Sequence, residues 1–195
     1  LGFLHWARRI EYMSLFLVAA TSLTTLVQVK KAVLVFMLSS FVVALYGFGQ
    51  IWLRFPVIST TNSEFAKGQI LYLENNARVN STFAGHYDLA VYLSIVLVLS
   101  ASLFFFYKDL RSRLLVLINS LIGFGLLGLT AARISFLATI VTIAGVFWLQ
   151  GKRLLVVGLI ILSILTVMVV PDLRHRLVAT LTVNILQGGG AKYTP

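Results

Sequence analysis

The sequence contains no cysteine and few acidic residues, and these two shortages exclude several kinds of chemistry. Without cysteine, the 195-residue chain forms no disulfide, no thiolate metal site and no cysteine nucleophile. Only 6 residues are Asp or Glu, and the 3 histidines are scattered with no pair of carboxylates beside them. No metal-ligand set and no serine–histidine–aspartate arrangement follows from such spacing. We therefore expect no metal and no cofactor, and we expect any catalysis to be metal-independent.

Charge of either sign is also scarce. Asp, Glu, Lys and Arg together make up 11% of the residues, whereas a soluble domain carries about 25%. Hydrophobic residues make up 59%, and the mean hydropathy is +0.95. Several apolar runs approach the length that crosses a bilayer. The composition predicts an all-α, polytopic membrane protein and excludes a soluble core with one anchor.

The apolar runs predict about six transmembrane helices in a single transmembrane domain that covers residues 1–195. A polar loop at about 54–87 separates the second span from the third, and a second polar loop is expected to start after 171. A short surface helix is expected at about 63–73, and an amphipathic helix at 173–186. The expected spans are 10–27, 32–53, 88–107, 114–129, 134–149 and 154–170.

The basic residues predict which side of the membrane each loop faces. The net charge is +10, with 16 Lys and Arg. Short loops dense in Lys and Arg mark the cytoplasm, and no basic patch with interleaved aromatics favours nucleic acid. Arg8 and Arg9 fall on the outer side, against this rule. The expected cytoplasmic turns carry Lys30 and Lys31, then Lys108, Arg111 and Arg113, then Lys152 and Arg153.

The same alternation places four other arginines on the non-cytoplasmic face: Arg78, Arg133, Arg174 and Arg176. Arginine is always charged and presents a planar fork that grips phosphate with two hydrogen bonds. The pattern favours a site for an anionic, phosphorylated ligand. Arg78 is equally compatible with a solvated loop side chain. Arg133 either extends to the membrane interface or faces a polar cavity.

His86 and Asp88 precede the third expected span and have simpler interpretations than catalysis. A histidine titrates near neutrality and is a candidate general base, but at a helix start it more often caps or packs. Asp88 is expected to be the N-cap of the span, where the helix dipole favours a carboxylate. His175 is interpreted as a surface residue between two arginines.

Three glycines, Gly123, Gly125 and Gly128, lie in the fourth expected span. Their Gly-x-Gly-x-x-Gly spacing matches a dinucleotide-binding motif. That motif requires a strand and a turn before it, whereas these glycines lie inside an apolar run. Small residues instead allow membrane helices to approach closely. We therefore expect close helix packing here.

Two segments resemble the O-antigen ligase and O-antigen polymerase superfamily. Residues 78–93 (RVNSTFAGHYDLAVYL) are similar to the segment before a membrane helix in that family. Residues 129–138 (LTAARISFLA) are similar to its second signature, in which Ser is common where this chain has Ala132. The two lie one helical hairpin apart, as in the family, and the resemblance covers roughly residues 8–186.

The resemblance implies a multi-pass enzyme of the bacterial inner membrane that takes a glycan from undecaprenyl diphosphate at the periplasmic face. Ligases pass the glycan to a lipid A-core acceptor and polymerases to a growing polysaccharide. The family's diphosphate-holding arginines correspond to Arg78 and Arg133, while His86, Arg174 and Arg176 are secondary candidates. The family's catalytic histidine lies in a large loop that begins here only at Pro171. We therefore expect this chain, which starts without Met, to be an inactive internal fragment whose catalytic base lies outside it.

Two other classes remain open at the level of sequence. In a transporter or flippase for an anionic or lipid-linked substrate, Arg78 and Arg133 would line the transport path. A structural subunit would need neither arginine. Transporters often contain internal repeats and broken helices, and no convincing repeat is present in this chain. Arg133 also falls at a helix end rather than in mid-span, which favours the transferase.

Overall fold

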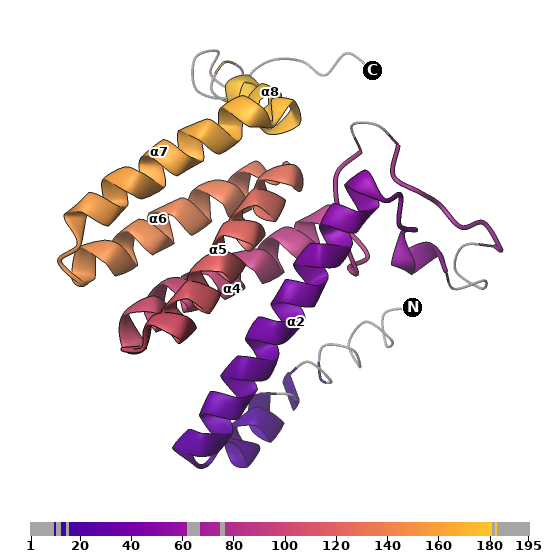
Figure 1. The fold of residues 1–195 in the computed structure, drawn as a ribbon. Helices are drawn as coiled ribbons and strands as arrows, with labels where there is room; N and C mark the ends of the chain where they lie inside the picture. The colour runs from indigo at the N-terminus through magenta and orange to yellow at the C-terminus, as the bar shows by residue number, and fades with distance from the viewer. Residues whose placement is uncertain are drawn as a thin grey trace. The chain divides into compact units, whose positions relative to one another are not determined.

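The computed structural model of the chain describes residues 10, 13–14, 16–61, 67–74, 77–180 and 182. These residues are helical or irregular, with one isolated antiparallel bridge between Pro56 and Tyr72. The prediction of an all-α protein is therefore confirmed for the described part. The chain divides into two compact units, Leu1–Ser39 and Ser40–Pro195. The named elements are α2 (Leu26–Trp52), the 3-10 turn η1 (Ile58–Thr60), α4 (His86–Phe106), α5 (Leu110–Leu129), α6 (Arg133–Leu149), α7 (Arg153–Val169) and α8 (Pro171–Ala179) (Figure 1).

Three of the described helices are long and apolar enough to cross a membrane: α2, α4 and α5. Helices α7 and α8 would count as a fourth span if taken together, but they meet at a bend of 102°. Helix α6 is apolar but has only 17 residues. At 1.5 Å per residue, such a helix is about 26 Å long, slightly less than the hydrocarbon core of about 30 Å. The structure thus supports a helical membrane protein, and the predicted number of six spans is not confirmed.

Within the unit Leu1–Ser39, helix α2 begins earlier than predicted. The Gln28 backbone N–H donates to Thr25 Oγ1 (3.3 Å), and the Thr25 N–H donates to Gln28 Oε1 (3.0 Å). This reciprocal pair is a capping box, which fixes the start of a helix. Lys30 and Lys31 therefore lie inside the first turns of α2 and not in a turn between spans, so that prediction is wrong.

Two predictions about the polar segments are also corrected. Residues 62–66 lie outside the described part, but the rest of the expected surface helix is not helical. Lys67 and Gly68 have positive φ angles of 52° and 79°. After 171 the chain does not enter a loop but continues as α8. Proline at the start of a helix loses no hydrogen bond, and its fixed φ suits the first turn, so Pro171 ends α7 and begins α8.

The Asp109 side chain marks where α5 begins. The carboxylate accepts a hydrogen bond from the Ser112 backbone N–H at 2.8 Å, as an N-cap does. Hydrogen bonds from the Ser112 side chain and backbone lower the pKa of Asp109 below its ordinary value. The carboxylate is therefore ionised at neutral pH and completes a tight turn between α4 and α5.

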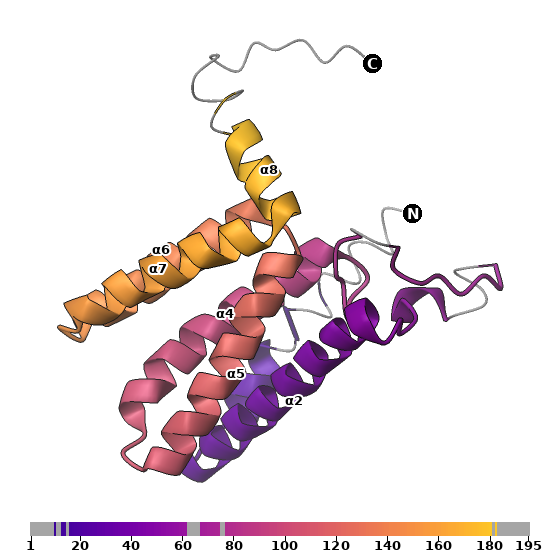
Figure 2. The ribbon, with the colours of Figure 1, turned by 45° about the horizontal axis from the view of Figure 1, so that its top comes forward.

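In the unit Ser40–Pro195, α4 packs against both α5 and α6, and α7 packs against α6 and α8 (Figures 1 and 2). The largest fully buried side chains include Leu89 and Leu93 of α4, Leu126 of α5 and Phe136 of α6. Leu89 and Leu93 are one helical turn apart, so one face of α4 fills the centre of the unit. The core therefore fixes the positions of the starts of α4 and α6.

Gly128 allows α5 and α7 to approach closely. A Cβ atom at Gly128 would lie 2.5 Å from Thr166 Cγ2 of α7. At Gly123 and Gly125 the nearest atoms would be 3.6 Å and 3.7 Å away, which is ordinary contact. The expectation of close packing is thus confirmed at Gly128 and not at the other two glycines.

Gly128→Ala should lower the stability of the protein by about 1–3 kcal/mol, because the added methyl overlaps a β-branched side chain with little freedom to move. Thr166→Ser removes the opposing methyl and should restore most of the loss in the double variant. The measurement is thermal unfolding in detergent followed by circular dichroism.

Gly145→Ala is the matched control, since a Cβ there meets nothing within 4 Å. Its stability should be unchanged or slightly raised. Equal destabilisation by the two alanine variants would contradict close packing at Gly128.

Candidate functional site

One end of the unit Ser40–Pro195 gathers the starts of α4 and α6 and the ends of α5 and α7. Consecutive packed helices joined by short turns run in opposite directions, so their ends alternate. Helix α8 leaves from this end after the bend that follows α7, as Figure 2 shows. The arginines at 78, 133, 174 and 176 all belong to this end. We call Arg78, Arg133 and Arg176 the arginine cluster.

Arg78 contacts His86, the first residue of α4. The Arg78 Nη1 atom lies 3.3 Å from His86 Nε2. A guanidinium has only donors, so Nε2 must accept, and the imidazole in this contact is neutral with its proton on Nδ1. The His86 ring also packs on Tyr87, with ring centroids 4.1 Å apart. His86 therefore links Arg78 to Tyr87, and its Nε2 is occupied by the arginine.

The helix start also corrects the role predicted for Asp88. The N-cap of α4 is Gly85, in an extended conformation and without a side-chain cap. Asp88 is exposed in the first turn of the helix, three residues beyond the N-cap. Its carboxylate still interacts favourably with the helix dipole, but the prediction that it caps α4 is wrong.

Arg176 connects α8 to two other elements through long hydrogen bonds. Its Nη1 atom lies 3.5 Å from the Tyr87 hydroxyl and 3.4 Å from the carbonyl oxygen of Ala131. Ala131 is buried in the turn between α5 and α6 and has a φ angle of 51°, in the left-handed region. This unusual conformation for a residue with a Cβ makes the turn tight, and the turn carries Arg133 at its end.

Arg133, the first residue of α6, is half-buried and donates from Nη1 to Thr180 Oγ1. The Thr180 hydroxyl in turn donates to the carbonyl oxygen of Arg176 at 2.7 Å. The end of α8 is therefore tied to the start of α6, and the two arginines share one threonine. Arg174 is exposed and takes no part in these contacts.

A continuous series of contacts thus runs from Arg78 through His86 and Tyr87 to the Arg176 guanidinium. The link from Arg176 to Arg133 is made by the Arg176 backbone carbonyl and the Thr180 hydroxyl. Among the described residues, no carboxylate forms an ion pair with any of the three arginines. In the described part of the chain, their positive charges are therefore not paired with a carboxylate in direct contact. Such a set attracts a ligand with several negative oxygens, and phosphate oxygens match the geometry of guanidinium donors. Within the same residues, no group of His, Asp and Glu is arranged to hold a metal ion.

The loop that carries Arg78 is anchored by a buried glutamine of α2. Gln50 is 1% exposed. Its Oε1 accepts from the Ser81 N–H (2.8 Å), and its Nε2 donates to the Ser81 carbonyl (3.2 Å). The Ser81 hydroxyl also donates to the carbonyl oxygen of Val43 at 2.6 Å. Ser81, three residues beyond Arg78, is therefore tied to α2 by three hydrogen bonds, two through its backbone and one through its hydroxyl.

Asn80, between Arg78 and the anchored Ser81, carries an unused acceptor. Its Nδ2 donates to the Phe83 carbonyl at 3.0 Å, while its buried Oδ1 has no partner among the described residues. Buried acceptors are usually paired. This oxygen is available to a hydroxyl or amide group of a ligand that reaches the loop.

An apolar cavity of about 270 Å³ lies at the same end of the unit as the arginine cluster. Leu129, the last residue of α5, and Val170, which directly follows α7, both line it at this end of the unit. It is lined by Phe48, Gly125, Leu129, Leu165, Thr166, Val169 and Val170. The cavity and the arginine cluster thus belong to the same end of the unit.

Sequence reasoning missed Tyr87, Thr180 and Gln50 as members or supports of the site. Tyr87 directly follows His86, and Thr180 follows Arg176 by four residues, one helical turn. That spacing could have indicated Thr180, whereas the Gln50–Ser81 contact joins residues 31 positions apart and has no local signal.

Gln50→Leu should lower stability by about 1–3 kcal/mol, because it leaves the N–H and carbonyl of Ser81 buried without partners. Hydrogen exchange at residues 77–85 should also become faster. The measurements are thermal unfolding and amide exchange by mass spectrometry in detergent.

Ser81→Gly is the control, because it keeps both backbone hydrogen bonds and places glycine at a φ angle of 49°. It should change exchange in the loop only slightly. Unchanged exchange in Gln50→Leu would show that Gln50 does not anchor the loop.

Comparison of the chain with protein-family models, with curated proteins and with solved structures finds no match. The chemistry of the site and the segments 78–93 and 129–138 are therefore the features that bear on function.

Proposed function

We propose that the chain is part of a glycan ligase or polymerase that moves a glycan from undecaprenyl diphosphate to an acceptor. The acceptor is a sugar of a lipid A-core or of a growing polysaccharide, and the site faces the periplasm. The observation that carries the proposal is the arginine cluster: Arg78 and Arg133, 55 positions apart, are linked through His86, Tyr87, Arg176 and Thr180. No carboxylate of the described residues forms an ion pair with these arginines.

The proposed reaction needs positive charge at the leaving group and no metal. An acceptor hydroxyl attacks the anomeric carbon, the bond from that carbon to the diphosphate oxygen breaks, and negative charge increases on the diphosphate. Preorganised guanidinium groups stabilise that charge. In this chain, Arg78 and Arg133 would hold the two phosphates, and Arg176 would support them from α8. The hydroxyl proton passes to a general base, a role that we assign to no residue of the cluster.

The apolar cavity at the cluster's end of the unit supports a lipid-linked donor over a soluble one. A polyprenyl diphosphate has a charged head directly joined to a hydrocarbon chain. The cavity lined by Leu129 and Val170 offers apolar surface at the same end of the unit, while the arginines offer donors for the head. A soluble sugar nucleotide would need no such apolar surface.

One feature favours the alternative of a transporter or flippase. Helices α7 and α8 meet at 102°, and discontinuous helices often build substrate sites in transporters. In that case, the arginines would bind the anionic head during translocation. The two functions differ in whether a glycosidic bond forms.

Arg78→Ala and Arg133→Ala in the full-length protein should each lower glycan transfer by about 10²-fold or more, the usual loss when one transition-state donor is removed. Arg133→Lys should recover little, because an ammonium cannot reproduce a two-bond grip. The measurement is transfer from a polyprenyl-diphosphate glycan to acceptor in detergent micelles, where a transporter has no compartments to connect.

Arg54→Ala is the matched control, since Arg54 is an exposed arginine on the same polar segment and outside the cluster. It should retain full transfer. Wild-type activity in both cluster variants would exclude the diphosphate grip. Absence of transfer by the wild-type protein in micelles, with translocation in vesicles that depends on Arg133, would favour the transporter.

A further inference from the structure

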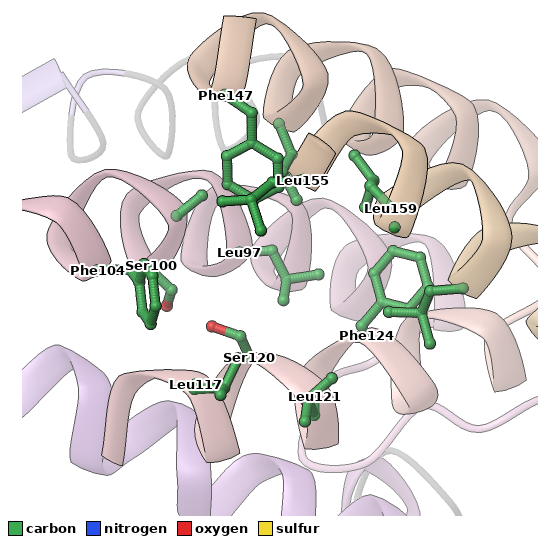
Figure 3. Close-up of a pocket in the computed structure, with 14 residues that line it drawn as sticks. Leu97, Ser100, Phe104, Leu117, Ser120, Leu121, Phe124, Phe147, Leu155 and Leu159 are labelled. Carbon is green, nitrogen blue, oxygen red and sulfur yellow. The ribbon is translucent and has the colours of Figure 1, made fainter. Parts of the chain in front are cut away.

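A second apolar cavity lies between four helices, in the half of the unit away from the arginine cluster. Its walls come from the later parts of α4 and α6, the middle of α5 and the first half of α7, and its volume is about 260 Å³ (Figure 3). It is lined by Leu97, Ser100, Ala101, Phe104, Leu117, Ser120, Leu121, Phe124, Ile143, Phe147, Leu155, Gly158, Leu159 and Leu162.

The cavity suits hydrocarbon rather than a polar molecule. Of the two hydroxyl groups in its wall, that of Ser120 donates to the Val116 carbonyl at 2.7 Å. Leu117, Leu121 and Leu155 are 40%, 49% and 38% exposed, so the cavity opens at the surface of the unit. An apolar cavity of about 150 Å³ already admits a benzene ring. The larger volume here accommodates several methylene groups of a chain that enters from the membrane.

A cation is attached to the wall of this cavity. The Arg113 guanidinium lies over the ring of Phe104, 4.5 Å from its centroid. Its Nε atom is buried, and among the described residues it has no hydrogen-bond partner. A guanidinium held on an aromatic ring keeps its charge and some of its donors available to an anion.

The surrounding turns are basic as well. Around Arg113, residues 107–113 and 150–153, each a turn together with the start of the next helix, contain five cations and one acid, Asp109, which caps α5 through Ser112. Arg153 repeats the arrangement of Arg113, with its guanidinium 5.1 Å from the centroid of the Trp148 ring. Asp109 is thus already hydrogen-bonded to Ser112. The remaining basic residues have charge complementary to an anionic head group.

We propose that this cavity binds an anionic phospholipid, with part of one acyl chain between α4, α5 and α7 and its phosphate against Arg113. The phospholipid is an occupant distinct from the glycan donor, because it binds at the opposite ends of the helices. The occupant follows from two adjoining observations: an apolar cavity that opens to the surface, and a guanidinium on its wall that forms no ion pair with a carboxylate of the described residues.

The test is native mass spectrometry of the detergent-purified full-length protein with phosphatidylglycerol or phosphatidylcholine of identical acyl chains. The wild-type protein should retain phosphatidylglycerol preferentially. Arg113→Gln should reduce that retention by about fivefold and leave phosphatidylcholine unchanged, and Arg113→Lys should keep part of the preference. Arg54→Gln, which removes a cation from the polar segment before α4, should have no effect.

The cavity is tested by filling it. Gly158→Leu should reduce retention of both lipids, because a Cβ at Gly158 meets nothing within 4 Å and the larger side chain can occupy the cavity. Gly145→Leu makes the same change at an open glycine outside the cavity and should retain both lipids. Equal retention of the two lipids by the wild type, or no difference between the two leucine variants, would overturn the proposal. An experimental structure in which a segment of protein occupies the cavity would also overturn the proposal.

Discussion

The position of the arginine-bearing loop depends on one buried amide group. Gln50 of α2 pairs with both backbone groups of Ser81, and a polar group in such a place is costly unless it is satisfied. The cost makes the pairing specific, because sliding the loop by one residue would leave a buried donor and acceptor unpaired. The contact is formed within the unit Ser40–Pro195, and it fixes the loop that precedes α4. The positions of Arg78 and His86 follow from it.

The sequence predicted the elements whose signals are local. Apolar runs indicated α4, α5, α6 and α7 to within a few residues, and the alternation of helix directions indicated that Arg78 and Arg133 belong to one end. The predictions failed where a short polar pattern is compatible with two different local structures. Asp88 has the chemistry of a cap, but Gly85 occupies that position. Lys30 and Lys31 suggested a turn, whereas the Thr25–Gln28 capping box places both lysines inside α2.

The details of the site were beyond sequence reasoning because they depend on distant partners. Arg176 reaches Tyr87 across 89 positions, and Arg133 reaches Thr180 across 47. No periodic pattern encodes such pairs. What the sequence could supply was the residue type: arginine beside apolar segments, without carboxylates to neutralise it. The same reasoning applies to Arg113, which looked like an ordinary loop cation until its ring contact with Phe104 was seen.

The position of α8 after α7 in the chain has a consequence for biogenesis. Arg176 and Thr180 lie on or just after α8, while Arg78 and His86 precede α4. A ribosome therefore completes the loop and four further helices before the last members of the cluster emerge. Until then Arg133 lacks its partner Thr180, and Tyr87 lacks its partner Arg176. The site is consequently assembled as the final step of inserting this part of the chain, after the helices that support it have been made.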